Sequence, residues 1–112
     1  MKITLKRHND FLIIKILELP NMQLDLTNIK IFKKKLIDSI PKKEKHIILD
    51  LENISYIDSS IIGLFVDLFN NYRNNQGTFG VLHINDKVYK ILELVNLTKF
   101  IQIYKSIDNL KK

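Results

Sequence analysis

Apolar residues recur along this chain in two patterns that alternate from the first residues to the last. Short, nearly continuous apolar runs predict strands, and segments with an apolar residue at every third or fourth position predict helices. Strands are expected at residues 4–7, 11–17, 46–51, 78–84 and 100–104. Helices are expected at 27–39, from about 61 until the turn at 74–77, and from 86 to 95. This β-β-α-β-α-β-α-β order predicts an α/β fold, in which helices pack on a mixed, mostly parallel sheet of four to five strands.

The helical spacing also predicts which residues form the core. The expected inward faces are Ile29, Phe32, Leu36 and Ile40; Ile61, Phe65, Leu68 and Tyr72, widened by Leu64 and Phe69; and Val88, Ile91, Leu92 and Val95. Residues Ile48, Leu49, Phe65, Leu68, Val81 and Leu92 should be buried. Pro41 should end the first helix, Gly77 is a plausible C-cap of the second, and Asp86 can cap the third.

Size and composition limit the class of protein. A chain of 112 residues with 46% hydrophobic residues is predicted to fold as one domain, residues 1–112. It has no cysteine, which excludes disulfides and thiolate chemistry and is compatible with a reducing cytoplasm. Charges interrupt the N-terminus before a signal-peptide core could form, and no apolar run approaches the roughly 18 residues of a membrane helix.

The net charge of +6 is concentrated in the first part of the chain. Residues 1–45 hold 11 Lys and Arg against five acids, whereas residues 46–112 hold seven of each. The excess gathers around Lys33–Lys35 and at Lys42, Lys43 and Lys45. A solvated helix face is the plainest interpretation, and steering of an acidic protein partner is an alternative. Direct nucleic-acid binding is disfavoured, because arginine is scarce and no aromatic residues are interleaved to stack on bases.

The most informative motif is Asp58-Ser59-Ser60, which lies between an apolar strand and a strongly periodic helix. The strand is the run His46-Ile47-Ile48-Leu49-Asp50-Leu51. The N–H groups and dipole at a helix N-terminus favour an anion, so a phosphate on one of these serines would be favourably placed. The motif therefore suggests a switch more than a catalyst.

The same residues have structural interpretations. Ser60 could serve only to cap the helix, and Asp58 could either orient the serine hydroxyl or cap the turn. Asp25 could cap the first helix or contact a partner. A catalytic serine is disfavoured, because there is no Gly-x-Ser-x-Gly motif and no histidine obviously placed as a base. Three histidines, at positions 8, 46 and 83, lack metal-ligand spacing, and no glycine-rich loop could cradle a phosphate. We therefore expect no enzymatic activity, no metal and no cofactor.

The run from His46 to Ser60, HIILDLENISYIDSS, resembles the signature of the STAS domain, which is found in bacterial anti-anti-sigma factors and in sulfate transporters. The family pattern is a hydrophobic strand, an acidic or amide residue, a short loop and then Asp-Ser-Ser or Asp-Ser-Thr before a helix. Leu24-Asp25 and the segment Asp86–Leu97 also resemble the family, and the order of elements agrees over nearly the full length.

The resemblance implies an anti-sigma factor antagonist that works by partner switching in the cytoplasm. The expected partners are an anti-sigma factor that is also a serine kinase, and a serine phosphatase that resets the system. The family's phosphorylated residue falls on Ser60, its preceding acid on Asp58, and its neighbouring acidic residue on Asp25. The implied partner-binding residues are Asp25, Asp58, Ser59, Ser60 and Ile61.

One position departs from the family pattern. Ile61 stands where the family commonly has glycine, directly after the phosphorylated residue. A branched side chain there is expected to add bulk and apolar surface beside the acceptor hydroxyl. This departure favours a second hypothesis, in which the chain is a constitutive STAS accessory subunit of a transport or stress-signalling complex.

Overall fold

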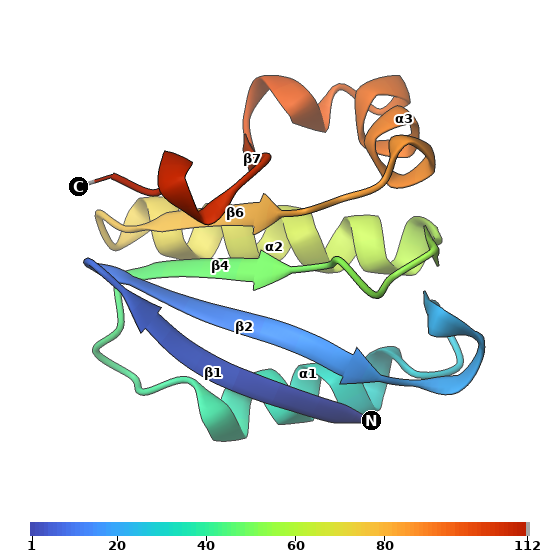
Figure 1. The fold of residues 1–112 in the computed structure, drawn as a ribbon, viewed down its shortest axis with the longest axis horizontal. Coiled ribbons are helices and arrows are strands. Elements are labelled where there is room, and N and C mark those ends of the chain that lie inside the picture. Colours follow the sequence, from blue (N-terminus) through green and yellow to red (C-terminus); the bar gives the residue numbers. More distant parts are fainter. Residues whose placement is uncertain (112) are drawn as a thin grey trace.

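A five-stranded sheet forms the centre of the molecule in the computed structural model, which describes residues 1–111 (Figure 1). Its strands lie in the order β1-β2-β4-β6-β7. Their bounds are Lys2–His8 (β1), Phe11–Glu18 (β2), His46–Asp50 (β4), Thr78–Leu82 (β6) and Gln102–Tyr104 (β7). β1 pairs antiparallel with β2, and every other neighbouring pair is parallel. The predicted mixed, mostly parallel sheet is therefore confirmed.

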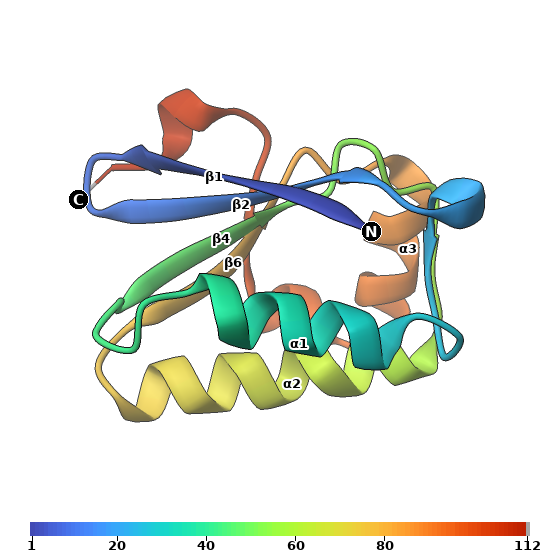
Figure 2. The same ribbon diagram turned by 90° about the horizontal axis from the view of Figure 1, so that it is seen from below.

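Three helices connect these strands. α1 (Ile29–Ser39) precedes β4, α2 (Ser59–Asn74) precedes β6, and α3 (Asp86–Leu94) precedes β7. Figure 2 shows α1 and α2 side by side on one face of the sheet, with both N-termini at the same end. The C-terminal segment, which contains the short 3-10 helix η3 (Ile107–Asn109), lies on the opposite face (Figure 2). The sheet is thus covered on both faces.

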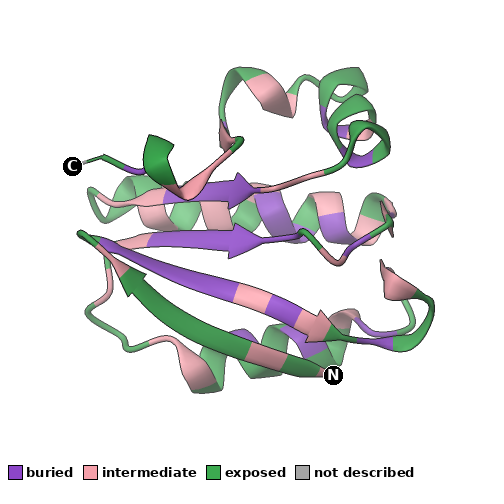
Figure 3. Cartoon of the chain, in the orientation of Figure 1, coloured by how far each residue is buried: buried purple, intermediate pink, exposed green. Residues whose placement is uncertain are grey.

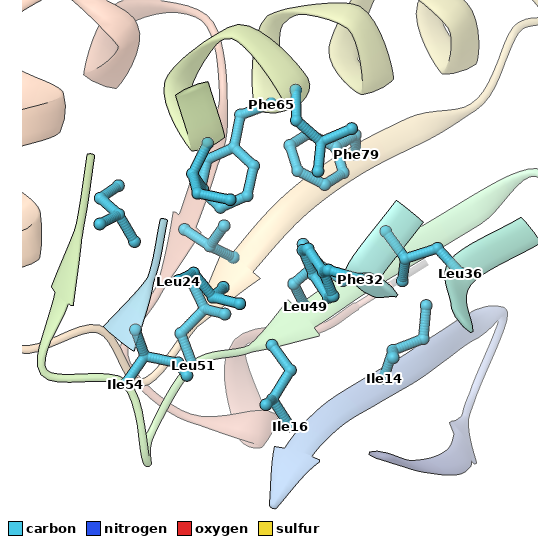
Figure 4. Packing of buried hydrophobic residues seen from close by; sticks show 14 of the residues in the cluster. Ile14, Ile16, Leu24, Phe32, Leu36, Leu49, Leu51, Ile54, Phe65 and Phe79 are labelled. Atoms are coloured by element: carbon cyan, nitrogen blue, oxygen red, sulfur yellow. The ribbon is translucent and has the colours of Figure 1, made fainter. Parts of the chain in front are cut away.

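The main core lies between the sheet and the α1–α2 pair (Figure 4). Phe32 and Leu36 of α1 are buried there, as are Phe65 of α2 and its ring partner Phe79 of β6. Of the six residues predicted to be buried, five are. The exception is Leu68, which is only partly buried because it packs at the margin of this core. Figure 3 shows the burial concentrated in β2, β4 and β6.

A smaller core fills the other face of the sheet. Its buried members are Phe11, Ile13, Ile48, Leu82 and Leu110. Leu110 comes from the C-terminal segment, so this segment covers one face of the sheet as α1 and α2 cover the other. Because β4 is covered on both sides, its sequence is a continuous apolar run instead of an alternating one.

Two short strands were not predicted from the sequence. β3 (Gln23–Leu24) and β5 (Tyr56–Ile57) form a separate parallel pair, with Gln23 beside Tyr56 and Leu24 beside Ile57. Two residues are too few to display a period. The short 3-10 helices η1 (Pro20–Met22) and η2 (Leu97–Lys99) were missed for the same reason.

Several predicted element ends need correction. α1 begins at Ile29, two residues later than expected, and α2 begins at Ser59, two residues earlier. Asn85, and not Asp86, caps α3 by accepting a hydrogen bond from the Val88 N–H at 2.7 Å. Val95 follows that helix and is 45% exposed, so its predicted core position is wrong.

Gly77 is required for close packing and not for a helix cap. It has no positive φ; the left-handed residue after α2 is Gln76, with a φ of 60°. A Cβ atom at position 77 would lie only 2.0 Å from the backbone oxygen of Lys45. Glycine therefore lets the chain entering β6 pass against the chain entering β4.

Candidate functional site

The Asp58-Ser59-Ser60 motif lies at the N-terminus of α2, and Asp58 is the residue that caps this helix. Its carboxylate oxygen Oδ1 accepts hydrogen bonds from the backbone N–H of Ser60 at 3.0 Å and of Ile61 at 3.3 Å. Such a cap satisfies N–H groups that have no partner within the helix. Serine is therefore not the capping residue, contrary to the structural interpretation of Ser60.

Asp58 also holds the Ser60 side chain and a neighbouring loop. The Ser60 hydroxyl donates to Oδ1 of Asp58 at 2.6 Å. The other carboxylate oxygen, Oδ2, accepts from the backbone N–H of Leu26 at 2.9 Å. The two interpretations of Asp58 offered by the sequence, orienting the hydroxyl and capping the turn, are therefore both realised by one carboxylate.

The β3–β5 pair brings the two loops of the site together. Asp25 follows β3 and Asp58 follows β5, so the parallel pairing places these residues side by side at the ends of adjacent strands. The backbone N–H of Asp58 donates to the carbonyl of Leu24 at 3.3 Å. The site is thus assembled from segments more than 30 positions apart, in agreement with the expected proximity of Asp25 and Asp58.

Asp25 does not cap α1, which corrects one of its two predicted roles. Its carboxylate accepts hydrogen bonds from the backbone N–H and the hydroxyl of Thr27, which closes a local turn. The residue that secures this loop is Asn28, whose side-chain amide donates to the Gln23 carbonyl at 2.8 Å and accepts from the Asp25 N–H at 2.9 Å. Asn28 was missed by the sequence analysis, and the only signal was an amide residue directly before a periodic segment.

The surface around Ser60 combines hydroxyl groups with one large apolar side chain. Ser59 is exposed and Ser60 is partly exposed. Leu26, held by its backbone to Asp58, is 72% exposed. An exposed leucine whose backbone is bonded to the residue that precedes the two serines is the kind of anchor that a protein partner can bury. Sequence reasoning missed Leu26 because a single apolar residue in a polar loop has no period.

Ile61 does not lie on this surface. Its side chain is fully buried in the main core. The expectation that it adds bulk and apolar surface beside the Ser60 hydroxyl is therefore wrong. Helical geometry explains the difference, since adjacent positions point about 100° apart and position 61 falls on the inward stripe with Phe65. The missing glycine consequently leaves the approach to Ser60 unobstructed, although a side chain without exposed surface is a poor candidate for a partner contact.

The helix N–H groups nearest Ser60 are already engaged. The amides of Ser60 and Ile61 donate to the Asp58 side chain, and that of Ile62 donates to the Asp58 carbonyl at 3.2 Å. The sequence analysis placed a phosphate on Ser60 favourably at these N–H groups. In the structure the groups are already hydrogen-bonded, so they are not free to bind it. It would have to compete with Asp58 for them.

The hydrogen bonds at the site fix the charge of Asp58. Burial alone would raise the pKa of its carboxyl group. The Ser60 hydroxyl and the amides of Leu26, Ile61 and Ser60 outweigh this effect, and together they lower the pKa below the usual value of 3.8. Asp58 is therefore a carboxylate at neutral pH.

This lowered pKa predicts a contribution of Asp58 to acid stability. A carboxyl group whose pKa is lower in the folded state stabilises the fold above its unfolded pKa, and this stabilisation disappears as the pH falls through the folded pKa. The free energy of unfolding of the native protein should therefore exceed that of Asp58→Asn at pH 7, and the difference should shrink below about pH 4. Urea titrations of both proteins between pH 7 and pH 2.5 would measure it. A difference that is constant over this range would contradict the assignment.

The basic residues lie away from Ser60. Lys42, Lys43 and Lys45 line a hollow of about 750 Å³ beside the C-terminal ends of α1 and α2. Ser60 is at the other end of α2, a helix of 16 residues and therefore about 24 Å long. The lysines of α1 are exposed, and Lys34 forms an ion pair with Asp38 at 3.4 Å. A solvated face describes these lysines well, and they take no part in the geometry around Ser60.

Within residues 1–111, no helix combines the length and the apolar character needed to cross a membrane.

Comparison with known proteins identifies the family. The model of the STAS domain matches residues 2–110. This chain belongs to the STAS domain family. A protein of Thermotoga maritima named as a candidate anti-sigma factor antagonist is 32% identical over 91 residues, which cover 80% of each chain. A crystal structure of a protein so named from the same organism superimposes with a TM-score of 0.81 at 30% identity, and covers 95% of this chain and 88% of the other.

Two further proteins are similar to this STAS protein over most of its length. The anti-sigma F factor antagonist of Paenibacillus polymyxa is 24% identical over 93% of this chain and 86% of its own length. The Bacillus cell fate determinant SpoIIAA, solved in its phosphorylated form, shares the fold with a TM-score of 0.65 at 17% identity, over 96% of this chain and 95% of its own. The STAS fold predicted from the sequence is confirmed. Anti-sigma factor antagonists are regulatory binding proteins and not enzymes, which agrees with the expectation for this chain.

Proposed function

We propose that this STAS protein is an anti-sigma factor antagonist that acts in the cytoplasm and is switched off by phosphorylation of Ser60. In its unmodified form it binds an anti-sigma factor, which thereby releases its sigma factor. The anti-sigma factor is also the serine kinase that modifies Ser60, and a serine phosphatase restores the binding form.

The observation that carries this proposal is the Ser60 hydroxyl, held 2.6 Å from the Asp58 carboxylate at the partly exposed N-terminus of α2. Asp58 fixes the direction of the hydroxyl, so a kinase meets an acceptor that is already ordered. Ser59 is more exposed, but no hydrogen bond orders its hydroxyl among the contacts described for residues 1–111. The names of the relatives support the role, and the phosphorylated form of SpoIIAA shows that a protein of this fold can carry the modification.

The physical effect of phosphorylation follows from the same geometry. A phosphate adds about −1.5 to −2 charge at neutral pH. On Ser60 it would replace a hydrogen bond to Asp58 with repulsion between two anions, because Asp58 is ionised. It would also compete for the amides that Asp58 caps, and could turn this carboxylate away from Leu26. Binding is then lost because the surface beside Leu26 gains charge and changes shape.

The observation that favoured the alternative, a constitutive accessory subunit, does not hold in the structure. That hypothesis depended on Ile61 obstructing the acceptor, and the Ile61 side chain is fully buried. It survives as one outcome of the experiment below.

The test is phosphorylation by the anti-sigma factor kinase of the same organism with ATP, followed by peptide mass spectrometry. We expect phosphate on Ser60, none on Ser60→Ala, and partner binding by Ser60→Ala in a pull-down that equals the native level. Ser60→Asp should bind more weakly, since it places a second carboxylate beside Asp58.

Ser59→Ala is the matched control, because it removes the neighbouring hydroxyl without touching the Asp58 contacts, and it should still be phosphorylated. Phosphate found on Ser59 would overturn the choice of residue. Intact partner binding with no phosphate on either serine would instead support the constitutive accessory subunit.

A further inference from the structure

Asp50, Glu52 and His83 form a cluster of metal-ligating side chains that the proposed switch does not use. One ligand atom from each residue lies within 4.8 Å of the others. The sequence analysis compared the three histidines only with one another and found no ligand spacing. The structure instead brings one histidine to two carboxylates, from segments more than 30 positions apart in the sequence.

The cluster lies where the carboxyl ends of two adjacent parallel strands meet. Asp50 ends β4, Glu52 follows it in the next turn, and His83 directly follows β6. Because side chains alternate along a strand and Ile48 belongs to the smaller core, Asp50 lies on the sheet face opposite α1 and α2. The cluster is therefore separate from Ser60, and ligand sites in α/β proteins commonly form at this edge of a sheet.

We propose that this cluster binds a divalent transition-metal ion such as zinc. Imidazole nitrogen and carboxylate oxygen are ordinary zinc ligands, at about 2.0–2.2 Å from the ion. Two ligands of one tetrahedral zinc are consequently separated by roughly 3.3 Å. The His83 Nδ1 atom is hydrogen-bonded to Oδ1 of Asp50 at 3.2 Å, and an ion that replaced this hydrogen bond would find the two ligand atoms already close to the required spacing.

Two of the ligands are held in place and the third can close. Asp50 is 4% exposed, and its Oδ1 also accepts from the Glu52 N–H at 3.1 Å. His83 adopts a left-handed φ of 60°, and its backbone N–H donates to the Tyr104 carbonyl at 3.2 Å. This backbone conformation fixes the direction of the Cα–Cβ bond of His83. The Glu52 side chain is 54% exposed, so it can turn toward an ion once its ion pair with Lys15 is released. A water molecule would complete four-coordination, as in open zinc sites.

Lys15 partly neutralises the charge of this cluster. Its ammonium group lies 2.7 Å from Oε1 of Glu52, and its side chain is 32% exposed. A divalent ion would replace the single positive charge of Lys15 with two positive charges. The Lys15 side chain would then move into solvent. The two positive charges of the ion then balance the two carboxylates. Lys15 is thus a competitor of the ion, and this gives the proposal a specific test.

The test is titration of the full-length protein with zinc chloride by calorimetry, and with cobalt chloride by visible absorption. We expect one saturable site and the absorption bands of a low-coordinate Co²⁺ ion. His83→Gln and Glu52→Gln should each weaken binding by about 10- to 100-fold or more, the range seen when even supporting residues of metal sites are removed. His8→Gln, which changes a histidine outside the cluster, should bind like the native protein.

Lys15→Met provides the decisive comparison. It keeps most of the side-chain length but removes the charge, so it should tighten zinc binding by up to about fivefold, the equivalent of one exposed ion pair that no longer has to be broken. No saturable binding, binding unchanged in both His83→Gln and Glu52→Gln, or binding that fails to tighten in Lys15→Met would overturn the proposal. Because Glu52 is exposed, its variant should fold even if changes at buried Asp50 do not.

Discussion

Replacing Phe65 with alanine should lower the free energy of unfolding by about 3–5 kcal/mol, the range for removing a large buried aromatic side chain. Phe65 is fully buried between α2 and the sheet, and its ring centre lies 5.6 Å from that of Phe79 (Figure 4). The substitution removes this contact and leaves a cavity that the sheet and helix can close only in part. Urea denaturation followed by circular dichroism would measure the change.

Phe100→Ala is the matched control for this prediction. Phe100 is 55% exposed, so the same chemical change should cost much less there. A small effect at Phe65, or equal effects at both positions, would mean that α2 buries a different face from the one described.

Replacing Asp58 with alanine should cost about 1–3 kcal/mol, which is large for a partly exposed residue. The variant loses a helix cap, typically about 1 kcal/mol, together with the hydrogen bonds from Ser60 and Leu26. The loss should appear as a lower urea midpoint. Because the β3–β5 region is held partly by this side chain, proteolysis near Leu26 should also become faster.

Asp25→Ala is the control for this prediction. It shows whether the loss of stability in Asp58→Ala comes from the contacts of Asp58 or from the removal of any acidic residue in the site. The Asp25 carboxylate bonds only Thr27 among the contacts described, so its removal should cost about 1 kcal/mol or less. If Asp25→Ala destabilised the protein as much as Asp58→Ala, the bond between the two loops would not be the source of the stability.

The fold could be predicted largely from the sequence because its main elements are long enough to show a period. Phe32 and Leu36, four positions apart, and Ile61 and Phe65 mark the inward faces of α1 and α2, and all four are buried. The predicted ends were less accurate, since they depend on single hydrogen bonds. At α3, for example, Asn85 and Asp86 are both good capping residues, and only the geometry shows that Asn85 is used.

Only part of the candidate site could be predicted from the sequence. Ser60 and Asp58 are adjacent to a strong strand-to-helix boundary, so their position could be inferred locally. The roles of Leu26 and Asn28 depend on the two-residue β3–β5 pair, and the cluster around Asp50 depends on the neighbouring ends of β4 and β6. Contacts between distant segments leave no pattern in either segment alone.

The bond from the Leu26 amide to Asp58 gives this protein an internal reporter. Leu26 has an exposed side chain, yet its N–H is hydrogen-bonded to a carboxylate 32 positions away. Its hydrogen exchange with solvent is therefore slowed while Asp58 keeps its present orientation, and accelerates when this carboxylate turns away. A single amide resonance thus reports the state of the α2 N-terminus in the isolated protein, without any partner in the sample.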